Sequence, residues 1–194
     1  MRRAINLCWR FFNLIKLNTY GINHGKHTVI HGHFGLYLAE NAFVRIGDFF
    51  YCSSGKHLNP LCRNIQANIT INKNAILCIG NNVGMSSPTI WAHISITIGN
   101  NVMLGANVTI MDSDAHSLNY KERRIPTLDK SKKHDKPIVI EDDVFIGMNS
   151  IILKGVTIGA RSIIDAGSVV TESIPADCIV AGNPAKIIRT LNHA

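Results

Sequence analysis

A period of six residues organises the second half of the chain. From Ile140 to Pro175 each group of six opens with an aliphatic residue, and its fifth position is small or β-branched. The opening residues are Ile140, Ile146, Ile152, Ile158, Ile164 and Val170. An α-helix turns by about 100° per residue and would scatter these side chains, whereas a strand alternates with period two, of which six is a multiple. The pattern predicts short strands joined by tight bends, with aliphatic side chains pointing inward, as in a β-solenoid.

The repeat is weaker toward the N-terminus and is interrupted twice. It is legible at residues 44–48 and regular again at 79–83 and 98–102. Residues 53–66 contain Gly, Pro and polar residues, which predict a surface loop. Residues 112–138 contain two prolines, seven basic and five acidic residues. Because a long insertion in a regular scaffold is often functional, we expect a projecting loop that carries chemistry.

The two ends of the chain differ from the repeat. Apolar residues in Met1–Leu17 fall at helical spacing among basic residues, although the segment is too short and too charged to span a bilayer. It also lacks the cleavage site of a signal peptide. Such a helix can cap the solenoid or lie on a membrane, and we expect the cap. At the other end, the spacing of Ile187, Ile188 and Leu191 predicts a short closing helix. We therefore divide the chain into an N-terminal arm or helix (1–27), the solenoid (28–175) and a closing segment (176–194).

Composition adds three constraints. A chain of 194 residues with 46% hydrophobic residues is enough for one domain with a core. The formal charge of +7 is compatible with nucleic acid or a membrane, but no nucleic-acid motif is present. We interpret the charge as a basic face that attracts an anionic cofactor. The five cysteines are odd in number and lack metal-site spacing, which favours reduced thiols and a cytoplasmic location.

Three stretches together resemble the hexapeptide-repeat acyltransferases. They are the hexads themselves, Asp112–His116 followed by Arg123 and Arg124, and the segment Ala181–Arg189. The resemblance implies an all-β fold, the left-handed parallel β-helix, with three hexads per triangular coil. It also implies acetyl-CoA as acyl donor, a homotrimer and an O-acetyltransferase of the galactoside, maltose or surface-polysaccharide type.

A hydroxyl group is a poor nucleophile near neutral pH, so acyl transfer to it needs a base, and histidine suits that task. The resemblance assigns this role to His116, at the start of the projecting loop. Asp114 lies two residues earlier and points the same way if the stretch is extended, so it could orient the imidazole or bind the acceptor. A turn-capping role for Asp114 is the alternative.

The resemblance also implies residues for the donor and the acceptor. The acetyl-CoA contacts fall on Met148, Ala166, Thr171, Lys186 and Arg189. Met148 departs from the small polar residue of the family, and Glu172 stands where a lysine is common. The acceptor contacts fall on Met85 and His93, with Asp114. Met85 and His93 fall where the galactoside enzymes carry polar acceptor contacts, which argues against galactoside as the substrate. The stretch Ser86–Trp91 looks more like the members that modify surface polysaccharides or their precursors, so we expect a sugar hydroxyl of such a glycan as acceptor.

Three other functions remain open on the same fold, because fold alone does not decide function. One is an N-acetyltransferase acting on an amino sugar or an antibiotic. Another is a γ-type carbonic anhydrase, which needs three histidines on one zinc; His93, His116 and His134 lack the spacing, so no metal is expected. A non-catalytic scaffold is disfavoured by the Asp114–His116 and Ala181–Arg189 stretches.

Overall fold

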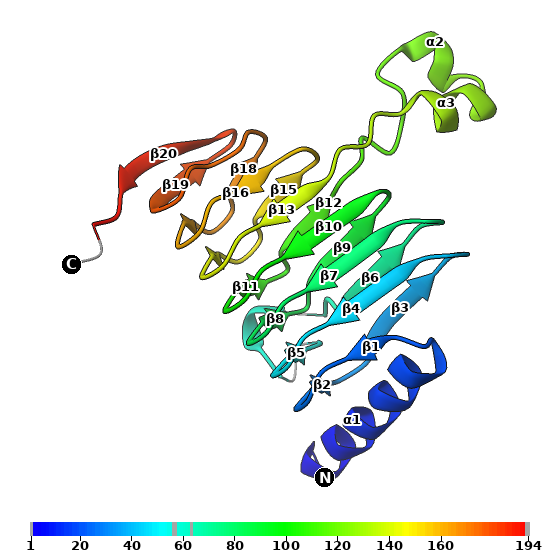
Figure 1. Cartoon of the computed structure of the whole chain (residues 1–194), viewed down its shortest axis with the longest axis vertical. Coiled ribbons are helices and arrows are strands. Elements are labelled where there is room, and N and C mark those ends of the chain that lie inside the picture. Colours follow the sequence, from blue (N-terminus) through cyan, green and yellow to red (C-terminus); the bar gives the residue numbers. More distant parts are fainter. Residues whose placement is uncertain (1, 56–57, 63, 193–194) are drawn as a thin grey trace.

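The chain winds into a three-sided prism of parallel sheets (Figure 1). The computed structural model describes residues 2–55, 58–62 and 64–192, with side chains from residue 7 onward, so the outermost residues of the predicted segments 1–27 and 176–194 lie outside the described residues. Strands follow one another around the three sides and pair with the strand one coil further on, which confirms the left-handed parallel β-helix.

Each side of the prism is one sheet. Sheet A contains β1 (Asn23–His24), β4 (Phe43–Ile46), β7 (Ile76–Ile79), β10 (Ser95–Ile98), β13 (Ile138–Ile140) and β16 (Thr157–Ile158). Sheet B contains β2 (Val29–His31), β5 (Tyr51–Ser53), β8 (Gly84–Ser86), β11 (Met103–Ala106), β14 (Phe145–Ile146), β17 (Ile163–Ile164), β19 (Cys178–Gly182) and β20 (Ala185–Thr190). Sheet C contains β3 (Phe34–Leu38), β6 (Ala67–Ile71), β9 (Thr89–Ala92), β12 (Thr109–Met111), β15 (Ile151–Leu153) and β18 (Val169–Val170).

The hexad positions fill the inside of the prism as predicted. The opening residues Ile146, Ile152 and Ile164 are fully buried. The serines at fifth positions are buried too, and their hydroxyls donate to carbonyls of the corners, such as Ser162 Oγ to Pro175 O at 2.8 Å. A small side chain fits there, and its hydroxyl satisfies a carbonyl that the bend leaves unpaired.

Stacked polar turns form the corner between sheets A and B. Asn82, Asn101 and Asp143 occupy successive turns with φ between 55° and 60°. Their side chains form a ladder, with Asn82 Nδ2 donating to Asn101 Oδ1 at 3.1 Å and Asn101 Nδ2 to Asp143 Oδ1 at 3.0 Å. Asn and Asp tolerate the left-handed conformation, so one side-chain type supplies both the turn and the contact between coils.

Both ends of the prism are covered. The helix α1 (Arg2–Thr19) lies against the first coil, where Asn13, 1% exposed, donates to the carbonyls of Ile30 and Gly32. At the other end β20 pairs antiparallel with β19. The predicted closing helix is therefore wrong: Ile187 and Ile188 lie in the edge strand, and both are exposed.

The interruption at 53–66 connects sheet B to sheet C and, in its described part, includes the short 3₁₀-helix η1 (Pro60–Cys62). No helix in the described part of the chain combines the length and apolar character needed to span a membrane.

Candidate active site

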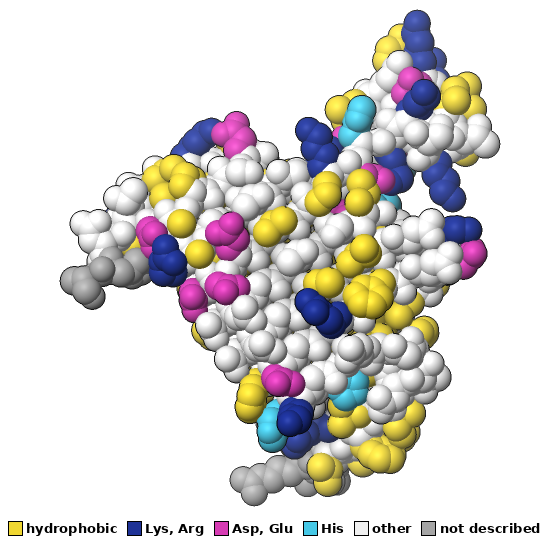
Figure 2. Space-filling view, in the orientation of Figure 1, with side chains coloured by type: hydrophobic (Ala, Val, Ile, Leu, Met, Phe, Trp, Pro, Cys, Tyr) yellow, Lys and Arg dark blue, Asp and Glu magenta, His cyan; other side chains and the backbone are white. Residues whose placement is uncertain are grey.

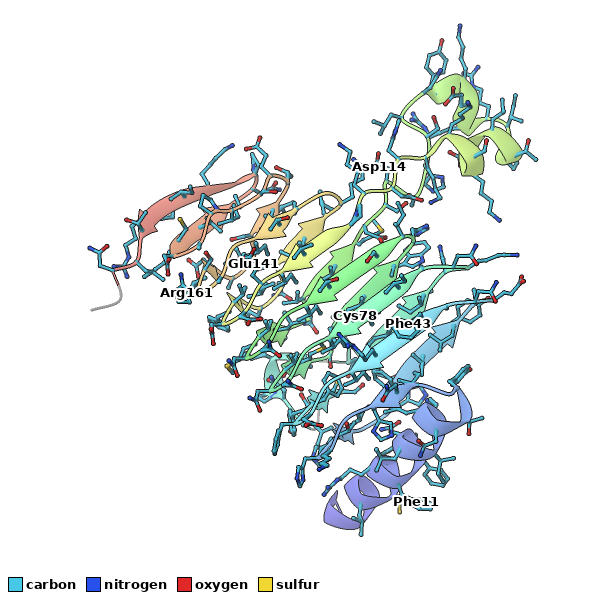
Figure 3. All side chains as sticks on the ribbon, viewed as in Figure 1. Phe11, Phe43, Cys78, Asp114, Glu141 and Arg161 are labelled. Carbon is cyan, nitrogen blue, oxygen red and sulfur yellow. The ribbon has the colours of Figure 1, made fainter. Side chains whose placement is uncertain are left out.

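The second interruption projects from the corner between sheets C and A (Figure 1). It connects β12 to β13 and contains two short helices, α2 (Tyr120–Arg123) and α3 (Pro126–Lys132). Backbone bonds close its base, from Asp114 N to His134 O at 3.0 Å and from Lys136 N to Asp112 O at 2.9 Å. Figure 3 labels Asp114 where the loop leaves the prism. The loop is thus an ordered projection held on a rigid scaffold, rather than a structureless segment.

His116 is paired with a carboxylate from α3. Its Nδ1 lies 2.7 Å from Oδ2 of Asp129, and the histidine side chain is 67% exposed while that of Asp129 is 16% exposed. The second carboxylate oxygen, Oδ1, accepts the backbone N–H of Ser117 at 2.8 Å. The hydrogen bonds from His116 and from the backbone N–H of Ser117 lower the pKa of Asp129, so its carboxyl group stays ionised at pH values below the usual pKa of an aspartate. An ionised acceptor at Nδ1 places the ring proton there and leaves the Nε2 lone pair free to take a proton.

The turn around His116 is supported from inside the loop. Ser117 is buried, and its Oγ donates to Oε2 of Glu122. Arg123 Nη1 donates to Ser117 O at 2.7 Å. Asn119 caps α2 by accepting the backbone N–H of Lys121 at 3.0 Å. The charged residues that follow His116 therefore hold its position.

Asp114 does not orient His116. Ala115 between them has φ of 62°, which ends the extended alternation that would make both side chains point the same way. Instead Oδ1 of Asp114 lies 3.1 Å from Nζ of Lys154, on the next coil, while its Oδ2 is buried without a hydrogen-bond partner. The orienting role predicted for Asp114 is filled by Asp129, and its acceptor contact stays a prediction.

Asp112 closes the corner directly below the loop. It is fully buried, and its two carboxylate oxygens accept the backbone N–H groups of His93, Ile94 and Ser95 at 2.6 to 2.8 Å. Three charge-assisted bonds fix the bend between β9 and β10 beneath the loop. Asp112 is therefore a structural residue of the site.

Replacing Asp112 by Ala is expected to lower the free energy of unfolding by about 3 kcal/mol, because three buried N–H groups lose a charged acceptor. Urea unfolding measures this loss, and Asp112→Asn should recover part of it by restoring one carbonyl acceptor. A change below about 1 kcal/mol in Asp112→Ala would contradict this role, since the loss of even one such bond exceeds that value.

The two residues predicted to contact the acceptor lie in different surroundings. Met85 is 2% exposed and belongs to the core inside the prism, so the predicted acceptor contact is wrong for this residue. His93 lies under the loop, where Nδ1 is 2.9 Å from Asn72 Nδ2 and 3.0 Å from Lys133 Nζ. Burial and then the charge of Lys133 lower the pKa of His93. Because Lys133 can only donate, Nδ1 of His93 acts as the hydrogen-bond acceptor, and the contact of His93 with the sugar acceptor stays a prediction.

The residues predicted to bind acetyl-CoA fall on two edges of sheet C and on β20. Met148 and Ala166 stand on the edge shared with sheet B, in the bends after β14 and β17. A Cβ at Gly147 would lie 2.5 Å from the backbone nitrogen of Ala166, so the bends of this edge are tightly stacked. Thr171 lies on the opposite edge, which sheet C shares with sheet A and with the His116 loop. The chain alone therefore does not bring these residues together.

The two basic candidates lie on the exposed strand β20. Lys186 is 3.6 Å from Oε2 of Glu172, and both side chains are mostly exposed. Arg189 is also exposed. A solvent-exposed ion pair is weak, so Glu172 leaves Lys186 able to contact an anion.

The histidines considered for zinc do not converge. His116 faces Asp129, and His93 is held by Asn72 and Lys133. Across the described ranges, no three His, Cys, Asp or Glu side chains are grouped as a metal site requires.

The chain is similar to many known proteins, of which three are described. Galactoside O-acetyltransferase of Escherichia coli is 32% identical over 155 residues, which cover 80% of this chain and 64% of that protein. A hexapeptide-repeat containing acetyltransferase of Vibrio cholerae, solved in complex with acetyl-CoA, is 35% identical, with 82% and 73% of the two chains covered and a TM-score of 0.47. The polySia specific acetyltransferase NeuO is 26% identical, with 89% and 77% covered and a TM-score of 0.56.

The chain spans about a quarter to just under two thirds of the length of the curated relatives that it matches. The family described as the hexapeptide repeat of succinyl-transferase matches residues 76–111 and 137–172, on either side of the projecting loop. These sequence matches show that the chain belongs to the hexapeptide-repeat acetyltransferase family.

Proposed function

We propose that this chain is an acetyl-CoA-dependent O-acetyltransferase whose acceptor is a sugar hydroxyl of a surface polysaccharide or its precursor. The observation that carries the proposal is the His116–Asp129 pair, an exposed imidazole whose Nδ1 proton is held by an ionised carboxylate. This arrangement supplies a base at Nε2, which acyl transfer to a hydroxyl requires.

Acetyl-CoA, when bound, supplies the acetyl group as a thioester. His116 Nε2 accepts the proton of the acceptor hydroxyl as its oxygen bonds to the acetyl carbon. His116 then returns that proton to the departing sulfur as the carbon–sulfur bond breaks. The products are an acetyl ester and coenzyme A in its thiol form, and the histidine ends neutral, as it began. Asp129 stabilises the imidazolium formed between the two steps.

The residues of the chain fit an elongated anionic cofactor. Ala166 and Gly167 on the edge between sheets B and C are exposed and small, which leaves room for an extended arm. Lys186 and Arg189 on β20 offer positive charge for phosphate groups. The acetyltransferases among the relatives support the same donor.

We infer that the complete site forms between copies of the chain, in a homotrimer. Within one chain, His116 and Thr171 lie on one edge of sheet C while Met148 and Ala166 lie on the other. A neighbouring copy that packs against this side can bring the second edge beside the first. The acetyl donor and the base would then come from two copies.

The choice of acceptor rests on two relatives. One is named a galactoside O-acetyltransferase, and the other a polySia specific acetyltransferase. Both names therefore denote acetyl transfer to a sugar or a glycan. Acceptors are compared by measuring release of the coenzyme A thiol with a panel of glycans, simple galactosides and amino sugars. Release with hydroxyl-only glycans supports the proposal, whereas release with amino sugars alone would replace it by N-acetylation.

Removal of the basic side chains of β20 should weaken the binding of acetyl-CoA. Lys186→Ala and Arg189→Ala are each expected to raise the Kd for acetyl-CoA about two- to fivefold, as for the loss of an exposed charged contact. Thermal unfolding with a ligand titration measures this, because about 100 times the Kd of ligand stabilises the fold by about 2.7 kcal/mol.

Lys73→Ala is the matched control, because Lys73 also forms an exposed pair, with Glu40 at 2.6 Å, but two coils before the loop. An unchanged Kd in both β20 variants would remove these residues from the donor site.

A further inference from the structure

The outer side of α1 is an unusually apolar surface. Its side toward the prism is used, since Asn13 bonds to the first coil, Leu17 is fully buried and Trp9 packs edge-on against His33. The side away from the prism exposes large hydrophobic side chains, at 44 to 66%. They are Leu7, Phe11, Phe12 and Ile15. Figure 3 labels Phe11 on this outer side. A helix that only caps a solenoid has no need of apolar residues there.

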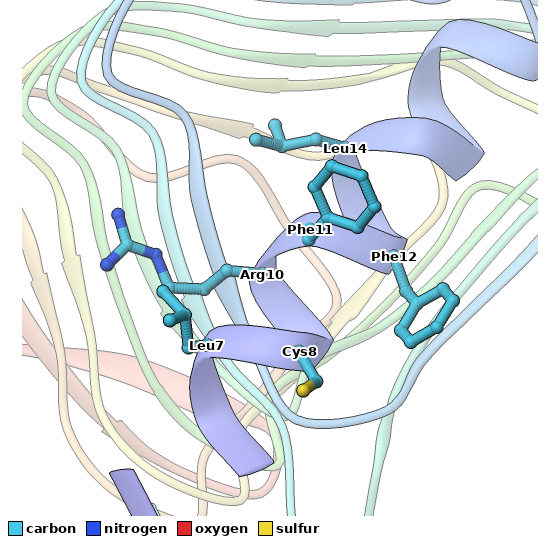
Figure 4. Close-up of a pocket in the computed structure, with 6 residues that line it drawn as sticks. All are labelled: Leu7, Cys8, Arg10, Phe11, Phe12 and Leu14. Atoms are coloured by element: carbon cyan, nitrogen blue, oxygen red, sulfur yellow. The ribbon is translucent and has the colours of Figure 1, made fainter. Parts of the chain in front are cut away.

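These side chains surround a shallow hollow. Leu7, Cys8, Arg10, Phe11, Phe12 and Leu14 line it. Figure 4 shows Arg10 extending from one side of α1 and Phe12 from the other. Arg10 is exposed, and burial and then the charge of Arg10 lower the pKa of His31 on the first coil. This arrangement places a cation at the boundary between an apolar face and water, where long basic side chains are favoured at a lipid interface.

The sequence segment that contains α1 is basic. The first 39 residues contain five Lys and Arg residues, and the first acidic residue of the chain is Glu40. This segment therefore accounts for most of the formal charge of +7. In Figure 2, hydrophobic side chains gather over the lower end of the molecule together with Lys, Arg and His side chains and one acidic side chain. A positive apolar end complements a surface that is negative outside and apolar beneath.

We propose that α1 docks this end of the molecule onto an anionic lipid surface. The helix would lie in the plane of the headgroups, with Phe11 and Phe12 entering the acyl boundary and Arg10 contacting lipid phosphates. Its 18 residues give a length of about 27 Å, enough for several headgroups. The inner side keeps its capping contacts, so docking requires no unfolding. This inference goes beyond the proposed acetyl transfer and does not depend on it.

Co-sedimentation with vesicles tests the proposal. The full-length protein is mixed with vesicles of phosphatidylcholine alone or with about one third phosphatidylglycerol. We expect binding to the anionic vesicles, at least tenfold weaker binding to the neutral ones, and loss at high salt, since the charge contribution is screened. Phe11→Gln combined with Phe12→Gln should reduce binding at least tenfold.

Two controls make the result specific. Phe43→Gln removes another exposed aromatic side chain, from sheet A, and this variant should bind vesicles like the parent protein. The α1 double variant should keep its melting temperature and its acetyl transfer in solution, because both phenylalanines are exposed and far from the loop. Equal binding of the double variant and the parent would overturn the proposal. Absence of vesicle binding by the parent protein would also overturn it. If the double substitution then abolished self-association, the occupant of this surface would be a second copy of the chain.

Discussion

His116→Ala is expected to lower kcat/KM for acetyl transfer by about 10²–10⁴-fold, because it removes the base that accepts the hydroxyl proton. The side chain is largely exposed and its contact is with Asp129, so the variant should remain folded. The Kd for acetyl-CoA should change little, since the thioester needs no base to bind. Thiol release under saturating donor measures the effect on turnover.

His134→Ala provides the matched control. His134 lies in the same loop, is exposed, and contributes its backbone carbonyl to the loop base, which the substitution keeps. We expect this variant to retain the parent turnover. Turnover of His116→Ala within threefold of the parent would exclude His116 as the base, whatever the acceptor.

Asp129→Asn should reduce kcat by about 10²-fold while the KM for acetyl-CoA stays nearly constant. In the parent, two carboxylate oxygens serve two donors, His116 Nδ1 and Ser117 N. An amide has only one acceptor oxygen. When that oxygen accepts the backbone N–H of Ser117, the amide NH₂ faces Nδ1 and places the ring proton on Nε2. A histidine protonated at Nε2 cannot take the proton of a hydroxyl.

Nitrogen-15 NMR of the imidazole separates this positioning role from a merely structural one. The parent should show the Nδ1–H form and the Asp129→Asn variant the Nε2–H form. Asp129→Glu, which keeps two oxygens, should recover part of kcat. An unchanged tautomer together with parent-like kcat would contradict the role of Asp129.

The pH dependence of this pair follows from the direction of the Asp129 shift. Its folded pKa is lowered, so its contribution to the stability of the loop is complete above the usual Asp value of about 3.9 and is lost as the pH falls through the lower folded pKa. Loss of acetyl transfer on mild acidification should therefore not come from Asp129.

The regular part of the fold could be predicted because each hexad repeats the same pattern, an aliphatic first residue and a small or β-branched fifth residue. Ile146, Ile152 and Ile164 are spaced by multiples of six, and each pairs with a residue one coil further on, namely Ile164, Val170 and Val180. The C-terminal helix was predicted wrongly because Ile187, Ile188 and Leu191 also fit helical spacing. The better signal was Gly182-Asn183-Pro184, a turn sequence that separates the two strands of the β19–β20 hairpin.

The candidate site was only partly predictable. His116 could be found because it opens the long interruption and lies in a stretch that resembles the family. Asp129 could not, since twelve residues, including the helix α2, separate it from His116, and the loop contains other carboxylates. Pro126 at the start of α3 signals the helix but not which side chain faces the histidine. Met85 was misassigned because an alignment of motifs does not show whether a strand residue faces inward.

The number of stacked coils also fixes the distance between α1 and the projecting loop. Four coils lie between α1 and the point where the projecting loop begins. Sheet C has three strand steps from β3 in the first coil to β12, where the loop begins, so at about 4.8 Å per step the loop leaves the prism about 14 Å above the first coil. A molecule held at a surface through α1 would thus act at a fixed height, on hydroxyls that stand away from the headgroups. Inserting one whole coil below the loop should raise that height by about 4.8 Å, and leave the His116 chemistry intact.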